Sequence, residues 1–225
     1  MICVGTELLL GSIVNTNAAY LAEKCAGLGL TCHFQTVVGD NEDRLAMVLQ
    51  TAMGRSDIVI LSGGLGPTED DLTKETAAKV CGRTLVMHEE SRERIRLFFA
   101  DRGMEPTENN WKQAMLPEGA VVLENHNGTA PGMILETEQA KVILLPGPPG
   151  ELTLMFEESV VPYLAALTSQ VICSQTVKIC GVGESKAEMM VKDLIDGQTN
   201  PTIATYAKTG EVHIRVTANA QDRKT

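Results

Sequence analysis

Residues 57–73, with the sequence DIVILSGGLGPTEDDLT, constrain the fold of this chain more than any other segment. The apolar run at residues 58–61 has the β-branched content of a strand that is covered on both faces. Gly63, Gly64 and Gly66 follow, and glycines permit left-handed backbone and leave no side chain between the amide groups and an anion. The segment therefore predicts a buried strand, a glycine-rich turn and the start of a helix, an arrangement that suits phosphate binding.

Acidic side chains follow this turn. Pro67 precedes Thr68, Asp70 and Asp71, and residues 72–80 are helix formers. A divalent cation could bridge the two acids to a phosphate that the loop holds. The same pattern also occurs where a glycine-rich turn binds nothing and an aspartate only caps a helix. The P-loop and Rossmann fingerprints are not met, because no Lys-Ser or Lys-Thr pair follows the glycines and the G-x-G-x-x-G spacing is missing.

The composition limits the classes of ligand. The chain has 225 residues, a formal net charge of −10 and a pI near 4.9. General nucleic-acid and membrane-surface binders take their affinity from clustered Lys and Arg, so we expect neither as a partner. An acidic chain that binds phosphate has to use backbone amides, metal ions or a local basic patch. No run in the sequence is apolar and long enough to span a bilayer.

The six cysteines stand singly in apolar contexts, without a CxxC pair or a Cys/His cluster. This pattern predicts reduced core thiols in a cytoplasmic protein and argues against a structural zinc site. The cysteines are Cys3, Cys25, Cys32, Cys81, Cys173 and Cys180.

Short β-rich segments alternate with helical patterns over the first 168 residues. Such alternation predicts an α/β fold with a mostly parallel sheet between helices. Strands are expected at residues 1–5, 31–38, 57–61, 121–123, 132–137 and 141–145, and helices at 17–29, 42–55, 72–81, 89–102 and 151–167. Pro162 is expected to kink or end the last of these helices.

The pattern changes after this segment, so we expect two domains, at residues 1–168 and 170–225. The second reads as a small α+β domain of the type β-α-β-β. Its elements are expected as a strand at 171–179, a helix at 184–195 and a hairpin of strands at 202–206 and 211–217.

A β-α-β-β unit leaves one face of its sheet without a covering helix. We expect apolar residues on that face, drawn from Val212, Ile214 and Val216 or their neighbours, to be exposed. An exposed apolar face favours pairing with a second copy, so a homodimer is predicted.

Polar and glycine clusters fall at the ends of several predicted strands, where open parallel sheets place their ligands. They form the motifs GTELLLG, NTN, VGDN, SGGLGPTEDDLT, NNWKQA, NGTAPG and LPGPPGE, which cover the chain in order from residue 3 onward. Through these motifs the chain closely resembles the competence/damage-inducible protein A (CinA) family, whose N-terminal domain is similar to the molybdopterin-binding domains of molybdenum-cofactor biosynthesis proteins.

The resemblance implies a three-layer α/β/α domain that binds a pterin phosphate or a nucleotide diphosphate over the carboxyl edge of the sheet. For this family it also implies metal-dependent hydrolysis of ADP-ribose to AMP and ribose 5-phosphate. Asp71 and Asp40 match acidic positions of molybdopterin adenylyltransferases, which implies catalytic carboxylates, and Asp70 and Asp71 would hold the metal. The implied metal is Mg²⁺, Mn²⁺ or Co²⁺, with potassium as a further candidate. Lys112 would be a third catalytic residue that adds positive charge.

Other residues of the motifs are expected to contact the substrate. Glu7 has the alternative role of bracing the first loop, and Asn15 and Asn17 those of a turn and a helix N-cap. The expected substrate-binding residues are Glu7, Asn15, Asn17, Gly63, Gly64, Gly66, Thr68, Asn110, Gln113, Gly128, Thr129, Gly147 and Glu151.

Residues 170–225 resemble the small KH-like domain that follows in this family. The turn at residues 181–184 lacks the GxxG form with basic neighbours that clamps a nucleic-acid backbone, which favours a spacer or dimerisation element. Full-length relatives commonly carry a further domain that deamidates nicotinamide mononucleotide. No part of this sequence corresponds to it, so we expect no deamidase activity from this chain.

Two classes of function fit these observations. One is a metal-dependent nucleotide pyrophosphatase, and the other is a binding module for a pterin or nucleotide without turnover. Asp40, Asp70 and Asp71 favour the first, since a binder of anions gains nothing from three carboxylates unless cations bind as well.

Overall fold

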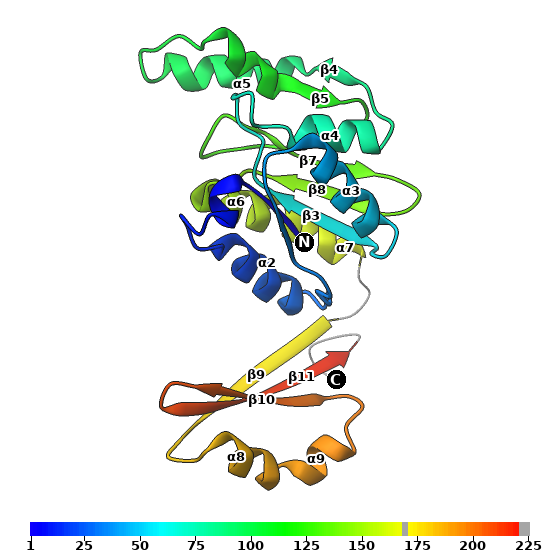
Figure 1. Cartoon of the computed structure of the whole chain (residues 1–225), viewed down its shortest axis with the longest axis vertical. Coiled ribbons are helices and arrows are strands. Elements are labelled where there is room, and N and C mark those ends of the chain that lie inside the picture. Colours follow the sequence, from blue (N-terminus) through cyan, green and yellow to red (C-terminus); the bar gives the residue numbers. More distant parts are fainter. Residues whose placement is uncertain (168–170, 221–225) are drawn as a thin grey trace. The chain divides into compact units, whose positions relative to one another are not determined.

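The computed structural model describes residues 1–167 and 171–220 (Figure 1). The chain divides into two compact units. The first comprises Met1–Ala22 and Cys32–Pro162, and the second comprises Glu23–Thr31 and the chain from Tyr163 onward.

The first unit is built on a six-stranded sheet in the order β2-β1-β3-β8-β7-β6. Strands β2, β1, β3 and β8 are parallel to one another, whereas β7 is antiparallel to both β8 and β6. This confirms the predicted mostly parallel sheet, although β2 is shorter than expected. The strands are β1 (Ile2–Val4), β2 (Thr36–Val38), β3 (Ile58–Ser62), β6 (Val121–Leu123), β7 (Gly132–Glu136) and β8 (Lys141–Leu145).

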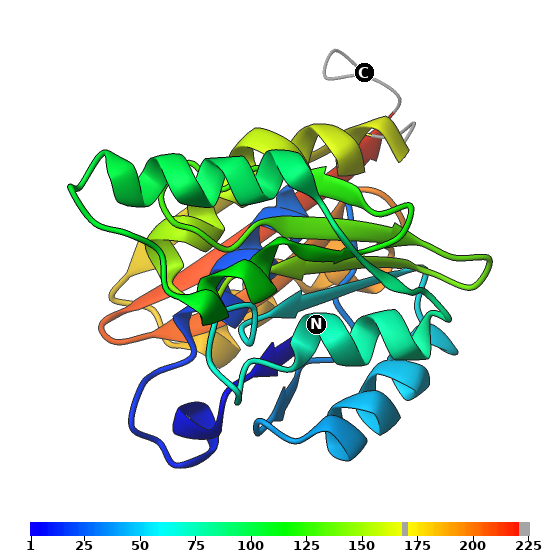
Figure 2. The same ribbon diagram turned by 90° about the horizontal axis from the view of Figure 1, so that it is seen from above.

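Helices lie on both faces of this sheet, as Figures 1 and 2 show. Strands β2 and β3 flank β1 on opposite sides, so right-handed crossovers place α2 and α3 on opposite faces. On one face α3 packs beside α4. On the other, Tyr20 of α2 lies edge-on to Phe156, with ring centroids 6.0 Å apart. The helices are α1 (Thr6–Leu9), α2 (Thr16–Gly27), α3 (Glu42–Met53), α4 (Thr73–Val80), α5 (Glu89–Ala100), α6 (Pro149–Met155) and α7 (Val161–Leu167).

The helix expected at residues 151–167 forms, and Pro162 does not end it. A π-helical turn, η2 (Phe156–Val160), connects α6 to α7 and immediately precedes the proline-containing segment. A proline ring clashes with the carbonyl group four residues earlier in a regular α-helix, and a wider turn gives it room. The sequence did not predict the 3₁₀ helix η1 (Glu108–Ala114) or the small antiparallel sheet of β4 (Leu85–Met87) and β5 (Met115–Pro117).

The central strands β3 and β8 carry the core of this unit. Val59, Leu61, Val142 and Leu144 are each at most 1% exposed. Because helices cover both faces, the whole apolar run of β3 is largely excluded from water, as the lack of alternation in its sequence predicted.

The second unit contains an antiparallel sheet in the order β10-β11-β9. The predicted hairpin forms, but the predicted helix is broken at Val191 into two short helices. The elements are β9 (Val171–Cys180), α8 (Glu184–Met190), α9 (Lys192–Asp196), β10 (Thr202–Lys208) and β11 (Glu211–Ala220).

The prediction of exposed apolar residues on this sheet is wrong for Val212 and Ile214, which are 4% and 8% exposed. Val216 is half-buried. Helices α8 and α9 contact β10, and Ala187 of α8 is fully buried, so the face that carries Val212 and Ile214 is covered at these residues. Val177 of β9, which pairs with Ile214 on the same face, is 55% exposed. The alternation in the sequence places Val212, Ile214 and Val216 on one face, but it does not say which face the helices cover.

The thiols are less uniform than predicted. Cys3 and Cys25 are buried, but Cys32 and Cys180 are exposed, so these two are not core residues. Cys32 lies in a segment without regular structure, and Cys180 ends the edge strand of a sheet. Apolar neighbours in the sequence do not reveal either position. In the part of the chain that the structure describes, none of the helices has the length and apolar character needed to cross a membrane.

Candidate functional site

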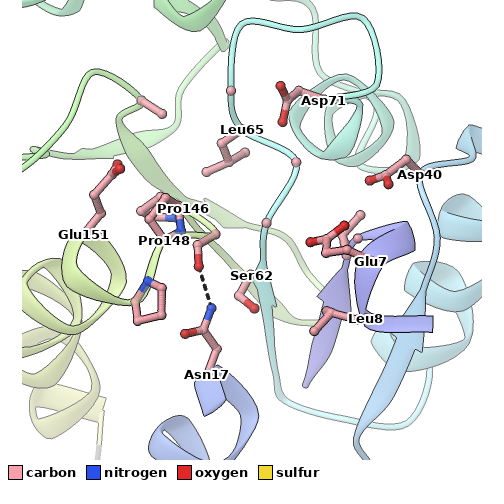
Figure 3. A pocket seen from close by; sticks show the side chains of 18 of the residues that line it. Glu7, Leu8, Asn17, Asp40, Ser62, Leu65, Asp71, Pro146, Pro148 and Glu151 are labelled. Carbon is pink, nitrogen blue, oxygen red and sulfur yellow. Dashed lines mark hydrogen bonds between the residues drawn. The ribbon is translucent and has the colours of Figure 1, made fainter. Parts of the chain in front are cut away.

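A cavity of about 850 Å³ opens at the carboxyl ends of β1, β2, β3 and β8 (Figure 3). The loops that follow these strands form its walls, together with the loop before α2 and the segment between β6 and β7. A volume of this size suits a ligand as large as a dinucleotide. The strand topology therefore brings together motifs that are distant in the sequence, as expected for an open parallel sheet.

Most of the predicted site residues line this cavity. Those that do are Glu7, Asn15, Asn17, Asp40, Gly63, Gly64, Gly66, Thr68, Asp70, Asp71, Gln113, Thr129, Gly147 and Glu151. Asn110, Lys112 and Gly128 are not among the lining residues.

The glycines after β3 are required by their surroundings. Gly63 and Gly64 have φ angles of 100° and 69°, in the left-handed region. A Cβ atom at Gly63 would meet the carbonyl oxygen of Val4, and one at Gly64 would meet the hydroxyl group of Thr73. At Gly66 a Cβ atom would lie 2.5 Å from Oδ2 of Asp71. The turn is thus packed tightly between β1, α4 and its own acidic residue.

This turn leaves backbone donors available. The amide of Gly63 donates to the carbonyl oxygen of Leu145 at 3.0 Å. The amides of Gly64, Leu65 and Gly66 make no hydrogen bond within the described part of the chain. Three successive free amides beside a cavity are suited to hold a phosphate.

Asp71 is fixed by its own loop. Its Oδ2 atom accepts hydrogen bonds from the amide of Thr68 at 2.9 Å and from the Thr68 hydroxyl at 2.5 Å. Neither bond uses Oδ1, and Figure 3 shows the carboxylate at the edge of the cavity. Asp70 beside it is exposed. The orientation of Asp71 is therefore set before any ligand binds.

Asp40 occupies a similar position after β2. Its Oδ2 atom accepts a hydrogen bond from the amide of Thr6 at 2.8 Å, and the amide of Asp40 donates to the Thr6 hydroxyl at 3.2 Å. These two bonds join the start of α1, which follows β1, to the loop that follows β2. Glu7 follows Thr6 in the first turn of α1, is exposed and lines the cavity.

Asn15 and Asn17 have structural contacts. The Oδ1 atom of Asn15 accepts from the amide of Ala18 at 3.1 Å, which is the helix-capping role considered from the sequence. The side-chain amide of Asn17 donates to the carbonyl oxygen of Gly147 at 2.8 Å (Figure 3). This second bond ties the start of α2 to the proline-rich turn after β8.

Glu151 lies in the first turn of α6, on the cavity wall that follows the carboxyl end of β8. Its Oε2 atom accepts a hydrogen bond from Nδ2 of Asn125 at 2.6 Å. Burial raises the pKa of the Glu151 carboxyl, and the bond from Asn125 opposes this. The same Nδ2 atom donates to the carbonyl oxygen of Ala130 at 2.8 Å, so Asn125 also holds the loop that carries Thr129.

The three predicted residues outside the lining have other contacts. Asn110 is buried, and its Oδ1 atom accepts from the amide and the hydroxyl of Thr107, both at 2.8 Å, as part of a capping box for η1. Gly128 lies behind Glu151, where a Cβ atom would meet the Glu151 carboxylate. The ammonium group of Lys112 donates to backbone carbonyl groups of Thr68 and Asp71. Direct contact of these three residues with a ligand stays a prediction.

The structure adds lining residues that the sequence did not single out. Ile13 and Val14 are 53% and 82% exposed, and both line the cavity. Exposed apolar side chains beside a cavity offer a surface for a flat heterocycle. In the sequence, the apolar pair just before Asn15 indicates this surface. The pair follows the short helix α1, which has no buried residue.

The electrostatic character of the cavity is unusual for an anion site. Among the described residues, those that line it include Glu7, Asp40, Asp70, Asp71 and Glu151 but no Lys, Arg or His. A phosphorylated ligand would have to rely on the free backbone amides and on added cations. The lining also contains Gln113, which is buried and whose Oε1 atom has no hydrogen-bond partner in the described chain. A donor from a ligand would remove the cost of this unpaired atom, about 1–3 kcal/mol.

The donor set fits a metal ion that is shared with the ligand. In residues 1–167 and 171–220, no three or more His, Cys, Asp or Glu side chains are grouped so that they could hold a metal ion by themselves. The acidic oxygens of Asp70, Asp71 and Asp40 are hard donors, which suit magnesium and manganese. Mg²⁺ is commonly held by one or two carboxylates and completes its shell with phosphate oxygens and water.

Comparison with known proteins gives the relationships of the chain. Residues 1–166 match the family model described as a probable molybdopterin binding domain, and residues 174–225 match the model of the damage-inducible protein CinA KH domain. The chain is 54% identical over 224 residues to CinA-like proteins from Dictyoglomus turgidum and Dictyoglomus thermophilum. These alignments cover 100% of this chain and 54% of each relative, so the chain spans about half the length of the curated relatives that it matches.

A solved structure is also similar. It is that of the protein CinA, of unknown function, from Thermoplasma acidophilum, which is 37% identical with a TM-score of 0.65. The match covers 71% of this chain and 95% of that chain.

Proposed function

Since the chain belongs to the CinA family, we propose that its first unit is a metal-dependent nucleotide pyrophosphatase that hydrolyses ADP-ribose to AMP and ribose 5-phosphate. The observation that carries this proposal is the acidic cavity at the carboxyl edge of the parallel sheet, with free amides at residues 64–66 and without a basic side chain among its described lining residues. An anion there would depend on backbone amides and added cations, since the described lining residues supply no basic side chain.

Different residues of the cavity would bind the phosphate and the metal. The amides of residues 64–66 would hold a phosphate of the diphosphate group. Asp70 and Asp71 would hold a divalent metal such as Mg²⁺, Mn²⁺ or Co²⁺ together with phosphate oxygens of the ligand, and potassium is a further candidate cation. Asp40 would be a catalytic carboxylate on the wall that follows β2. The metal, when bound, would spread the negative charge that develops on the phosphoryl oxygens.

Glu151 is the carboxylate that we assign to proton transfer. It lies on a different wall from Asp71, and its raised pKa makes it a better proton acceptor than an ordinary glutamate. Water attacks one phosphorus atom of the diphosphate, and its proton passes to Glu151. The new oxygen–phosphorus bond replaces the bridging one, and the second phosphate leaves with the electron pair of the broken bond.

The cavity can also accommodate the rest of a dinucleotide. Ile13 and Val14 would pack against a heterocycle, and Gln113 would contact a polar group of the ligand. A pterin phosphate has the same elements, a flat heterocycle and a phosphate, so it is the alternative ligand for a non-catalytic module.

We further propose that the protein acts in the cytoplasm and takes a small phosphorylated ligand. The homodimer stays a prediction, because Val212 and Ile214, which suggested it, are buried. The net charge of −10 supports a partner that is neither nucleic acid nor an anionic membrane.

Incubation of the purified chain with ADP-ribose and Mg²⁺, Mn²⁺ or Co²⁺ tests the proposal, with AMP and ribose 5-phosphate measured by chromatography. We expect equal amounts of both products, and none after excess chelator. Calorimetric titration with ADP-ribose and with a pterin phosphate separates the alternatives. Tight binding without product formation would identify a binding module and refute the pyrophosphatase assignment.

A further inference from the structure

Lys112 contacts residues 68–71, here called the acidic loop, and is not among the residues that line the cavity. Its Nζ atom donates to the carbonyl oxygen of Thr68 at 2.8 Å and to that of Asp71 at 2.7 Å. These two carbonyl groups are at the ends of the segment that carries Asp70. One ammonium group therefore bridges the two ends of residues 68–71.

A second lysine fixes the first. Lys74, in the first turn of α4, is 3% exposed, and its Nζ atom donates to the carbonyl oxygen of Lys112 at 2.5 Å. The nearest carboxylate oxygen, on Glu75, is 3.6 Å from this nitrogen. Burial lowers the pKa of Lys74, and the charge of Glu75 opposes this. A buried ammonium group is costly unless it is paired and hydrogen-bonded. Here the hydrogen bond from Lys74 holds the backbone of η1 at Lys112, the residue that bonds to the acidic loop.

We propose that Lys112 is a positioning residue that holds the carboxylates of Asp70 and Asp71 for metal binding, and that Lys74 positions Lys112. The two lysines connect α4, η1 and the acidic loop through hydrogen bonds from side chains to carbonyl oxygens. The part that concerns metal binding rests on the proposed function. The part that concerns the loop does not.

A direct electrostatic role and a positioning role of Lys112 predict opposite changes in cation affinity when its charge is removed. If its positive charge acted directly on the site, removal of the charge would strengthen the binding of a cation. If its hydrogen bonds hold the loop, removal would weaken cation binding, because Asp70 and Asp71 would no longer be held in place. Loss of a residue that orients metal ligands typically lowers metal affinity about 10- to 100-fold.

Hydrogen exchange tests the position of the loop without metal or substrate. In Lys112→Met, we expect amide exchange in peptides that cover residues 66–73 to be at least about tenfold faster than in the parent, because about 1.4 kcal/mol of lost local stability is a tenfold change. Lys74→Met keeps a side chain of similar length and should give a smaller increase in the same peptides. Lys79→Met is the control, since Lys79 is exposed on the same helix and pairs with Glu42.

The second measurement is the Mn²⁺ concentration that gives half of the maximal hydrolysis of ADP-ribose. It should rise about 10- to 100-fold in Lys112→Met, with part of the loss restored by Lys112→Arg, which can still donate to both carbonyl groups. The Lys79→Met variant should match the parent. Far-UV circular dichroism verifies that each variant is folded.

Unchanged exchange at residues 66–73 in Lys112→Met would overturn the positioning role, and so would tighter Mn²⁺ activation. If the parent does not hydrolyse ADP-ribose, the pyrophosphatase proposal fails, whereas the exchange experiment still decides whether the lysines hold the loop.

Discussion

The two sheets of this protein bury their strands in different ways. In the first unit, the parallel strands β3 and β8 are apolar over most of their length and are excluded from water on both faces. In the second unit, Val212 and Ile214 of β11 are buried, and the intervening His213 is half-buried. A sheet that is covered on both faces has only its strand ends left for a ligand, which is where the acidic cavity lies.

The largest expected difference between the two sheets is in their tolerance of truncation. Leu144→Ala in β8 should lower the free energy of unfolding by about 2–5 kcal/mol, because it leaves a cavity in place of a core residue that is 0% exposed. Val177→Ala in β9, where the side chain is 55% exposed, should change it by less than about 0.5 kcal/mol. Urea denaturation measures both. Equal losses would contradict the contrast between the sheets.

Replacement of an aspartate should also have a larger effect in the first unit than in the second. Asp71→Asn should keep the fold and lower the turnover of ADP-ribose by about 10²-fold or more, the scale of one lost preorganised electrostatic contact. Asp196→Asn, which removes an exposed partner of Lys192 in the second unit, is the matched control. Steady-state kinetics with Mn²⁺ distinguishes them, and full activity of the Asp71 variant would remove this residue from the metal site.

Glycines provide a third contrast. Gly66→Val should abolish ADP-ribose binding and cost about 1–3 kcal/mol of stability, because the new side chain would overlap the Asp71 carboxylate. At Gly183 in the second unit, a Cβ atom would meet open space, so Gly183→Val should leave binding unchanged. Calorimetry with ADP-ribose gives the answer, and binding of normal affinity by the Gly66 variant would show that the turn does not approach the ligand.

The smallest effect is on the dependence of stability on pH, and its sign differs between two glutamates. Burial raises the pKa of Glu151, so its contribution to stability is present below the unfolded pKa and is lost as pH rises through the folded pKa. Hence Glu151→Gln should be more stable than the parent at pH 8, by about a few tenths of a kcal/mol for this half-exposed group, and equal to it at low pH. In the parent, activity should rise with pH as Glu151 loses its proton, at a pH above the ordinary pKa of glutamate. Glu151→Gln should lose this rise in the pH–rate profile.

Glu211 in the second unit should behave in the opposite way. A hydrogen bond from His213 lowers the pKa of Glu211, so its contribution is present above the unfolded pKa and is lost as pH falls through the folded pKa. Glu211→Gln should therefore be less stable than the parent near pH 6. Thermal unfolding at several pH values compares the two variants, and shifts of the same sign would refute the assignment of Glu151 to a desolvated site.

The local structure around the turn after β3 is encoded in neighbouring residues. The run at residues 58–61, Gly63, Gly64 and the acids that follow are specified by short-range rules, since β-branched residues, left-handed glycines and helix starts leave their signature within a few residues. The same rules placed Asp40 and Asp71 at strand ends, and strand ends of a parallel sheet meet at one edge. The cavity follows from this combination.

Contacts between distant residues were not accessible in this way. The bonds from Lys112 to Thr68 and Asp71 span 44 and 41 positions, and that from Asn17 to Gly147 spans 130. A lysine in a polar motif reads as a ligand contact from sequence, because its long side chain can reach in several directions. Only the packing of η1 against the acidic loop directs it away from the cavity.

The sequence by itself therefore determined the class of the sheet, the succession along the chain of its strands and of most of the flanking helices, and the glycine and acidic residues of the turn, because these depend on the periodicity and backbone freedom of neighbouring residues. The tertiary structure decided which residues of the small sheet are covered, that Ile13 and Val14 are exposed beside the cavity, and that Lys112, itself contacted by Lys74, bonds to the acidic loop. These features depend on which surfaces meet when the elements pack, and no local pattern encodes that choice.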